Sequence, residues 1–546
     1  MTDDDFLRAI IDHHDDDLPR LAYADWLDDH GSGDRAEFIR VQCELAKADE
    51  ADPRYRQLED REHELLSSNE RKWFDSSGCS EWEWKRGFVE SVTLGRETPA
   101  ERIPELFERQ PIVEWHHFFY SIAALHNEPE LAQRIQRLTL FMSILGRIDP
   151  DAFGESTVYS KVEHLVLHGN DRPAPMIERL LNWTPAARLK SLVFDGYTEI
   201  GPQLGRFSFA TAPPRLERLS GYGIDEAGLT AFLQQPGCVA LKHLDISEQP
   251  LLLVSEAPFW SAHPDLRLES INLSGNGIDD SLLRAILDCP SFEGLTSLAY
   301  DDAMDDYINF ESVAQTRYWQ QAIEFSARSS LHYGLQREQI FRYPVSEHLH
   351  RLDLSYNNFG TKGIADLAEA GWLRPVSWLA LTGNGLDDDT CKCLAREGSF
   401  TRLRTIHLSD PTRDRKNQRL TYRGLRILAR SQVINKLRVL SLSRSGLNDA
   451  CALEIIESPS WQLSGLDLSD NDLTGVFVRA LAKSPRLRRL NLLKLTNNPS
   501  LGGRVLLPLA ESPHLSPLCE LDLAGIRLDP IVQQAIRERL GPRFSC

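Results

Sequence analysis

The sequence has no regular cysteine framework. Its nine cysteines are odd in number and irregularly spaced, unlike the paired cysteines of a small disulfide-stapled secreted domain. Cys391 and Cys393 form one close pair, but a zinc site built from such pairs needs a second one at a matching spacing. We therefore expect the cysteines to be small buried residues of a protein from a reducing compartment.

Long apolar runs are also missing. No stretch approaches the ~18 consecutive apolar residues of a membrane-spanning helix. The N-terminus, MTDDDFLRAIIDHHDDD, carries acids where a signal peptide has a basic region. We expect a cytoplasmic protein that does not associate with a membrane.

The chain has no excess of basic residues either. It contains 61 Lys and Arg against 80 Asp and Glu, a net charge of -19. Residues 1–50 alone carry fifteen acidic and five basic side chains. Because nucleic-acid affinity comes largely from contacts between cations and phosphates, we expect no nucleic-acid partner. A protein partner with a basic or mixed-charge surface is expected instead.

Motifs of catalysis are absent from the sequence. It has no GxxxxGK[ST] phosphate loop, no HExxH zinc helix and no GxSxG nucleophile elbow. Acidic pairs such as Asp279-Asp280 and Asp387-Asp388 stand where helices are expected to begin, and carboxylates there bond free N–H groups. We predict no enzymatic activity, no cofactor and no metal site.

Residues 348–370 show most clearly the unit that recurs along the rest of the sequence. Leu349, Leu352 and Leu354 are followed by Asn357 and then by apolar residues spaced three to four apart. This order predicts a short strand, a turn and a helix. We expect the asparagine side chain to satisfy backbone groups that the turning chain leaves unpaired.

Copies of this unit recur, mostly at intervals of 27 residues. The interval from Leu403 to Leu437 is 34 and that from Leu487 to Leu518 is 31. Because one unit cannot bury both its strand face and its helix face, the copies must stack. The first apolar positions are Val89, Ile112, Ile135, Val162, Leu189, Leu216, Leu241, Leu268, Leu295, Leu349, Val376, Leu403, Leu437, Leu463, Leu487 and Leu518, and the asparagine recurs at Asn170, Asn276, Asn357, Asn384 and Asn471.

The pattern LxxLxLxxNxL, with helical second halves such as LDDDTCKCLA, closely resembles leucine-rich repeats of the ribonuclease-inhibitor-like subclass. The resemblance implies an α/β solenoid, a horseshoe with parallel strands on the concave face and helices on the convex face. We assign residues 85–546 to it.

Residues 1–80 are expected to form a separate, all-α domain. The strings YADWL at 23–27 and RAEFIR at 35–40 resemble the repeat-companion domain that precedes leucine-rich repeats in bacterial proteins. That resemblance implies architecture and a bacterial cytosolic origin, but no biochemical activity. On physical grounds the domain covers the apolar end of the first repeat. We expect Asp25 and Glu37 to pair with Arg20, Arg35 or Arg40.

Three stretches interrupt the period. One is the interval of 31 from Leu487 to Leu518, which is expected to contain an added turn at Asn497-Asn498-Pro499. Residues 302–346 are irregular and rich in aromatic side chains, and they form either a buried, degenerate repeat or a protruding binding loop. The longer interval after Leu403 contains a basic insertion with Arg413, Arg415, Lys416 and Arg419. Insertions in solenoids emerge as loops and often carry function.

Side chains at alternate strand positions point to the concave face. Aromatic residues and histidines gather there, as in protein-binding hot spots. Two alternatives stay open: the cap domain covers the N-terminal aromatic residues, or the histidines hold a metal. The predicted partner-binding residues are His116, Phe118, Phe141, His164, His168, Tyr222, His243, Trp378 and His407.

These observations predict a non-enzymatic scaffold that recognises a protein partner on its concave face. A regulator of an enzyme, such as a GTPase-activating protein of the leucine-rich repeat type, is an alternative that rests on analogy of fold. A repeat-linked ubiquitin ligase would need a further catalytic domain with a cysteine, and the repeats run to the end of the sequence.

Overall fold

The computed structural model describes residues 1–48, 54–95, 98, 102–116, 129–141, 160–168, 188–195, 215–221, 226–233, 236–248, 265–302, 310–331, 341–410 and 420–546. The chain forms two compact units. The N-terminal unit comprises Met1–Gly223 with Gln235–Cys238, and the C-terminal unit comprises Ile224–Gln234 with Val239–Cys546.

Four helices open the N-terminal unit, within the segment that we expected to be all-α, and parallel strands follow. Apart from the antiparallel β1–β2 hairpin, the pairings of its described strands are parallel. Its elements are α1 Asp3–Asp12, α2 Asp17–Asp29, α3 Gly33–Leu45, α4 Tyr55–Trp73, β1 Cys79–Lys85, β2 Phe88–Leu94, α5 Arg102–Arg109, β3 Glu114–His116, α7 Pro129–Ala132, β4 Arg137–Phe141, β5 His164–His168, β6 Ser191–Asp195 and β7 Arg218–Gly221.

The helices are fastened to the β1–β2 hairpin by buried polar contacts. Arg20, completely buried, donates from Nη2 to Oε1 of Glu90 at 2.7 Å. Gly87 donates its N–H to Oε1 of Gln42 at 2.5 Å. Its φ is +90°, and a Cβ there would lie 2.5 Å from Cγ1 of Ile39. Only glycine lets the hairpin approach α3 this closely.

The predicted surface ion pairs of the helices are formed in part. Arg40 bonds Asp25 at 2.7 Å, as expected. Glu37 instead pairs with Arg61 at 2.6 Å, a residue of α4 that the prediction did not consider. Arg35 makes no ion pair with any carboxylate of the described residues.

The C-terminal unit repeats the strand–turn–helix motif along its length. Its described strand pairings are all parallel and follow chain order. Its elements are α12 Glu226–Leu233, β8 His243–Asp245, β9 Ser270–Asn272, α13 Asp280–Leu287, β10 Ser297–Ala299, α14 Phe310–Ala314, α15 Arg317–Gln321, β11 Glu324–Ser326, β12 Arg351–Asp353, α17 Gly360–Glu369, β13 Trp378–Ala380, α18 Asp388–Leu394, β14 Thr405–His407, α19 Tyr422–Arg430, β15 Val439–Ser441, α20 Asp449–Ile456, β16 Gly465–Asp467, α21 Gly475–Lys483, β17 Leu492–Lys494, α22 Leu507–Ala510, β18 Glu520–Asp522, α23 Pro530–Leu540 and β19 Phe544–Ser545.

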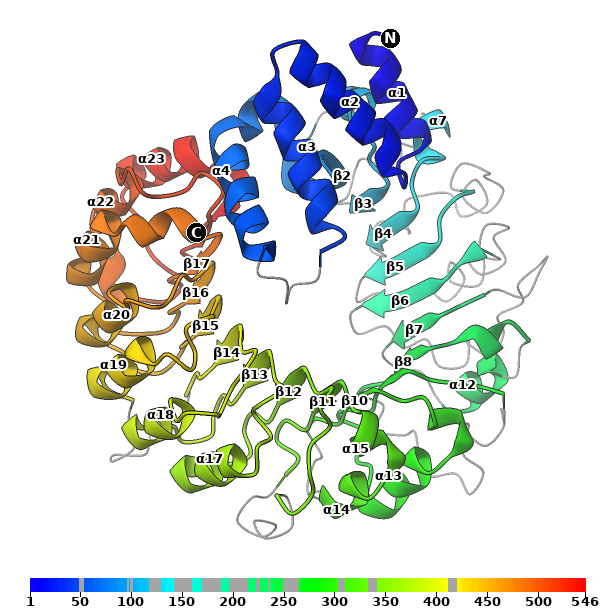
Figure 1. The fold of residues 1–546 in the computed structure, drawn as a ribbon, viewed down its shortest axis with the longest axis vertical. Coiled ribbons are helices and arrows are strands. Elements are labelled where there is room, and N and C mark those ends of the chain that lie inside the picture. The colour runs from blue at the N-terminus through cyan, green and yellow to red at the C-terminus, as the bar shows by residue number, and fades with distance from the viewer. Residues whose placement is uncertain are drawn as a thin grey trace. The chain divides into compact units, whose positions relative to one another are not determined.

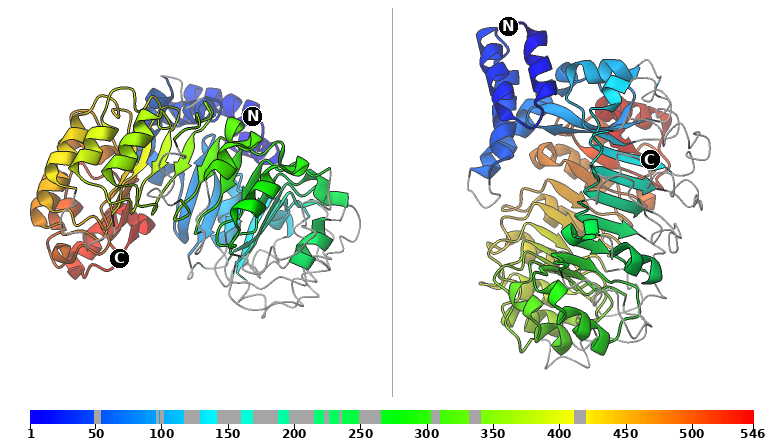
Figure 2. Two further views of the ribbon diagram at one scale, coloured as in Figure 1. Left: turned by 90° about the horizontal axis from the view of Figure 1, so that it is seen from below. Right: turned by 90° about the vertical axis from the view of Figure 1, so that its right-hand side faces the viewer.

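Strands and helices form two layers within the C-terminal unit. Strands β10–β17 lie side by side, and helices α17–α23 lie outside them (Figure 1). Two other views show the same layering of the yellow-to-orange helices against their strands (Figure 2). The leucines that the pattern places inside, such as Leu352 and Leu354, are completely buried between the layers. Each such burial stabilises the fold by about 1.5–3 kcal/mol.

The recurring asparagine links successive repeats. The side-chain amide of Asn384 donates to the backbone oxygens of Leu354 at 2.9 Å and Leu381 at 3.0 Å. Its Oδ1 accepts the N–H groups of Asn357 and Phe359. The predicted role of the asparagine in satisfying backbone groups is therefore confirmed. Asn170 lies outside the described residues.

The repeat frame near the C-terminus was wrong. The buried asparagine in phase with the others is Asn498, which donates to the oxygens of Leu468 and Leu495. The repeat therefore begins at Leu490, and Leu487 belongs to a short 3-10 helix before it. From Leu463 the intervals become 27 and 28, so no insertion of four residues exists here.

The aromatic segment at 302–346 contains a repeat. Its strand β11 pairs with β10 and β12 in register. Phe310, Trp319 and Phe325 are buried, and their rings contact one another. Of the two alternatives, the buried repeat therefore holds for the described part of this segment. The basic insertion at 411–419 lies outside the described residues.

The acidic pairs of the repeats lie at the N-termini of helices. Asp279 and Asp387 are N-caps that accept the N–H groups of Leu282 and Thr390. Asp388 reaches into the next repeat and accepts the N–H of Thr421 at 2.8 Å. The carboxylates thus satisfy helix donors, as predicted. None of the described helices combines the length and the apolar character needed to cross a membrane.

The predicted α/β leucine-rich repeat solenoid with a small helical N-terminal region is confirmed. The nine cysteines are all free and six of them are buried. The proposed boundary between residues 80 and 85 stays a prediction, since α1–α4 and the first repeats belong to one compact unit.

Candidate site on the inner strand face of the C-terminal unit

Alternate side chains of β12–β18 face away from the helices, and we call this surface the inner strand face. In β12 and β14 the central residue is buried, whereas the residues on either side of it are half-buried or exposed. Because the strands pair in register, residues one period apart are direct neighbours. Arg351 thus lies beside Trp378, and Ala380 beside His407.

An arginine is stacked on the tryptophan of this face. The Cζ atom of Arg351 lies 3.4 Å from the centroid of the Trp378 ring. On its other side the indole contacts the His407 ring, with centroids 5.0 Å apart. The guanidinium is exposed, and it makes no ion pair or hydrogen bond with the described residues. Its in-plane N–H groups are therefore available to an acceptor.

Burial sets the protonation of the histidine. The half-buried imidazole of His407 has a pKa below its usual 6.5, chiefly because burial disfavours the charged ring. Asp353 opposes this shift of the pKa and Arg351 adds to it. Near neutral pH, His407 is thus an uncharged donor and acceptor beside the Trp378 ring.

A second arginine–aromatic pair lies on the next turn. Tyr356 is 37% exposed, and the Cζ of Arg328 lies 4.7 Å from its ring centroid. We did not predict this residue from the sequence. The sequence contained a signal for its position, because Tyr356 directly precedes Asn357, where the chain leaves the strand.

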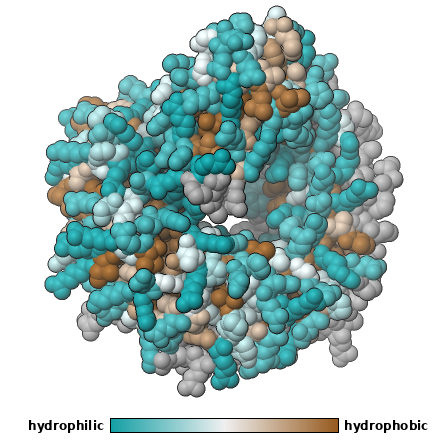
Figure 3. Space-filling view, viewed as in Figure 1, coloured by the Kyte–Doolittle hydropathy of each residue, from teal (hydrophilic) through white to brown (hydrophobic). Residues whose placement is uncertain are grey.

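A shallow hollow of about 520 Å³ continues from Tyr356 across the later strands. Its walls carry hydroxyls, carboxylates and two cations, Arg444 and Lys494. On the face shown in Figure 3, hydrophobic residues lie in separate groups among hydrophilic ones. The lining of the hollow, with its hydroxyls and charges beside Tyr356, suits polar recognition around a few aromatic anchors.

Three of the predicted histidines lie on strands of the N-terminal unit. His116 bonds Oγ1 of Thr139 through Nδ1 at 3.0 Å. His168 is half-buried and bonds Oδ2 of Asp195 through Nδ1 at 2.9 Å. His164 is half-buried, and its pKa is lowered first by burial and then by Arg137.

The strand register keeps these histidines apart. His164 is in the row of Arg137, His116 in the row of Thr139, and His168 in the row of Phe141. Among the residues that the structure describes, no three or more His, Cys, Asp or Glu side chains are placed to hold a metal ion.

The other predicted residues are placed only partly. Phe118 and Tyr222 lie outside the described residues, as does the side chain of Phe141. His243, at the start of β8 in the C-terminal unit, is half-buried.

Comparison with known proteins agrees with this architecture. The family model described as Leucine Rich repeat matches residues 345–368, the stretch that contains β12. The fold is that of leucine-rich repeats. No curated protein sequence matches the chain significantly.

Solved structures similar to this chain include the Rad7 and Elc1 complex of yeast, at 14% identity, with 75% of this chain and 90% of that chain covered and a TM-score of 0.40. An internalin from Listeria monocytogenes is 13% identical, with 75% and 86% covered and a TM-score of 0.26. A protein from Bacteroides fragilis is 12% identical, with 76% and 84% covered and a TM-score of 0.30. The fold assignment therefore rests on the repeats of the chain itself.

Proposed function

We propose that this protein is a non-enzymatic interaction scaffold that binds a protein partner on the inner strand face of its C-terminal unit. The observation that carries the proposal is the stacking of Arg351 on Trp378 at 3.4 Å. Tryptophan and arginine are the residues most enriched in binding hot spots, and rigid strands hold this pair in place.

The charges around the pair define the partner's surface. Arg351 favours a partner carboxylate, because its guanidinium has no acidic partner among the described residues. Asp467 and Asp522, which line the hollow, favour a partner cation. A protein with a mixed-charge surface fits both, and its association rate should fall as salt rises.

The same proposal includes the predicted residues of the earlier strands. We also propose partner contacts at His116, Phe118, Phe141, His164, His168, Tyr222 and His243, in addition to those at Trp378 and His407. We propose a cytoplasmic location, with neither nucleic acid nor membrane as partner.

A pair of variants tests the proposal. Trp378→Ala and Arg351→Glu should each weaken partner binding about 30-fold, which corresponds to about 2 kcal/mol for a hot-spot residue. Circular dichroism and the unfolding midpoint report whether the variant is folded. If both variants are folded and bind the partner like the wild type, the proposed face is wrong.

A further inference from the structure

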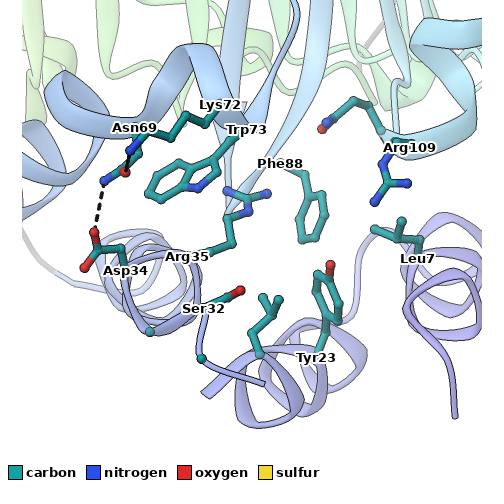
Figure 4. Close-up of a pocket in the computed structure, with 14 residues that line it drawn as sticks. Leu7, Tyr23, Ser32, Asp34, Arg35, Asn69, Lys72, Trp73, Phe88 and Arg109 are labelled. Carbon is teal, nitrogen blue, oxygen red and sulfur yellow. Dashed lines mark hydrogen bonds between the residues drawn. The ribbon is translucent and has the colours of Figure 1, made fainter. Parts of the chain in front are cut away.

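The four-helix part of the N-terminal unit contains a second pocket, distant in sequence from the inner strand face. It has a volume of about 570 Å³, within the range of about 300–1,000 Å³ typical of ligand sites. Residues from α1–α4, the β1–β2 hairpin and α5 line it (Figure 4).

Arg35 enters this pocket between two aromatic rings (Figure 4). Its Cζ lies 5.0 Å from the centroid of Trp73 and 4.9 Å from that of Phe88. Aromatic rings stabilise the faces of a guanidinium, but its N–H donors lie in the plane and need acceptors. The rings therefore do not accept hydrogen bonds from the N–H groups of Arg35.

The in-plane donors of Arg35 are only partly satisfied. Nη2 donates to the backbone oxygen of Gly87 at 2.5 Å. Nη1 is shielded from solvent and has no acceptor among the described residues. Burial lowers the pKa of Arg35 to about 9, a shift that the nearby Tyr23 opposes and Arg20 increases. The half-buried Arg35 has no carboxylate partner among the described residues, and an anionic ligand would compensate its charge.

The charge of the pocket wall differs from that of the surrounding domain. Three cations line it, Arg35, Lys72 and Arg109, against one carboxylate, Asp34. Arg109 is shared with Asp3, which it contacts at 2.7 Å, and Lys72 bonds the amide oxygen of Asn69 at 3.1 Å. The pocket is thus rich in cations, whereas residues 1–50, which form part of its wall, carry fifteen acidic side chains.

The start of α3 adds backbone donors to the same wall. The N-cap Ser32 makes no side-chain cap hydrogen bond. The first turn of the helix, with Gly33 and Asp34, lines the pocket. Free N–H groups and the helix dipole there favour a negative group.

We propose that this pocket binds an acidic peptide segment of a protein partner, with a Glu or Asp carboxylate on Arg35. A planar guanidinium matches a carboxylate through two parallel hydrogen bonds. The apolar walls, which include Leu7, Leu27 and Phe88, would hold an apolar side chain next to the acid. This site is independent of the inner strand face, so either proposal can fail alone.

Calorimetry of the full chain with two capped heptapeptides tests the assignment. One peptide has a central Glu between Leu and Phe, and the other has Gln in its place. The Glu peptide should bind at least 10-fold more tightly than the Gln peptide, and added salt should weaken it. Equal binding of the two peptides, or no binding of either, overturns the proposal. Inorganic phosphate that binds as tightly as the Glu peptide overturns the peptide assignment.

Variants connect the binding to the pocket. Arg35→Lys keeps the charge but loses the planar fork, and should weaken the Glu peptide about 10-fold. Lys72→Glu, at an exposed side chain, should also weaken it and is not expected to unfold the domain. The matched control is Arg40→Lys. Arg40 lies on α3, like Arg35, but its guanidinium bonds Asp25 and Asp28, so this substitution should leave the affinity for the Glu peptide unchanged. If Lys72→Glu folds and binds like the wild type, the site is wrong.

Discussion

Arg20 donates a 2.7 Å hydrogen bond to Glu90, and the two side chains are 0% and 5% exposed. The pair joins helix α2 to strand β2 across 70 residues of sequence. Burial raises the pKa of Glu90, while Arg20 and Arg86 oppose that shift. Loss of Arg20 would leave the buried Glu90 with Arg86 alone, whose Nη2 lies 3.1 Å from Oε1 of Glu90. Breaking a buried ion pair is costly, because the remaining charge stays away from water with fewer partners.

Replacing Arg20 should therefore destabilise the N-terminal unit strongly. Arg20→Met is expected to lower the free energy of unfolding by about 3–5 kcal/mol, measured by denaturant titration. Arg40→Met removes two partly exposed ion pairs, with Asp25 and Asp28, and should cost less than about 1 kcal/mol. Equal effects of the two substitutions would show that burial of the Arg20–Glu90 pair has no energetic consequence.

Gly87 offers a test of how closely the hairpin approaches α3. Gly87→Ala places a methyl group 2.5 Å from Cγ1 and 2.9 Å from Cα of Ile39, at a φ of +90°. Gly31→Ala has a similar φ of +78° but no atom within 4 Å of the new Cβ. Backbone strain of about 1–2 kcal/mol is common to both, so Gly87→Ala should lower the unfolding free energy clearly more. Comparable losses in denaturant titration would refute the close packing.

The asparagine ladder can be tested at Asn384. Asn384→Ala removes four hydrogen bonds to buried backbone groups. Each unsatisfied group costs about 1–3 kcal/mol, so amide hydrogen exchange should accelerate in the repeats beginning at Leu349 and Val376. Asn435→Ala, at an exposed position, is the control and should leave exchange unchanged. Unaltered protection in the Asn384 variant would contradict the role of the ladder.

The environment of His407 predicts two opposite shifts of its pKa. Asp353→Asn should lower the His407 pKa further, and Arg351→Gln should raise it, because the two charges act in opposite directions. Titration of the imidazole Hε1 resonance by NMR measures both. Shifts of the same sign in the two variants would exclude this arrangement of charges.

The lowered pKa of His407 also has a consequence for stability. The unfolded chain protonates this histidine near pH 6.5, before the folded chain does. Stability contributed by the neutral ring is thus complete above pH 6.5 and is lost as pH falls from there through the folded pKa. His407→Gln should reduce the fall in unfolding free energy between pH 7.5 and pH 5.5.

Much of the fold follows from the sequence, because one period of 27 fixes the stacking of repeats. The frame at Leu487 was wrong because LRRLNLLKL offers several leucine registers, and only the buried Asn498 selects one. Trp378 and His407 were placed correctly on a common face by strand alternation.

Other parts of the two sites were not predicted. The stacking of Arg351 on Trp378 had a signal, a separation of one period, which we did not use. The pocket around Arg35 had none. It depends on helices α1–α5 and the β1–β2 hairpin meeting in space, with rings from Trp73 and Phe88 around a cation that lacks a carboxylate. The spacing of residues in the sequence does not show that Arg35 has no carboxylate partner.

Site-specific photo-crosslinking tests the central claim most directly. A benzophenone amino acid replaces Thr405, the strand neighbour of Trp378, or Lys392, an exposed residue of the outer helix α18. We predict that a protein partner is crosslinked from position 405 but not from 392, and that the additional Trp378→Ala substitution strongly reduces this product. Crosslinking from 392 without crosslinking from 405, or a product at 405 that Trp378→Ala leaves undiminished, would contradict recognition on the inner strand face.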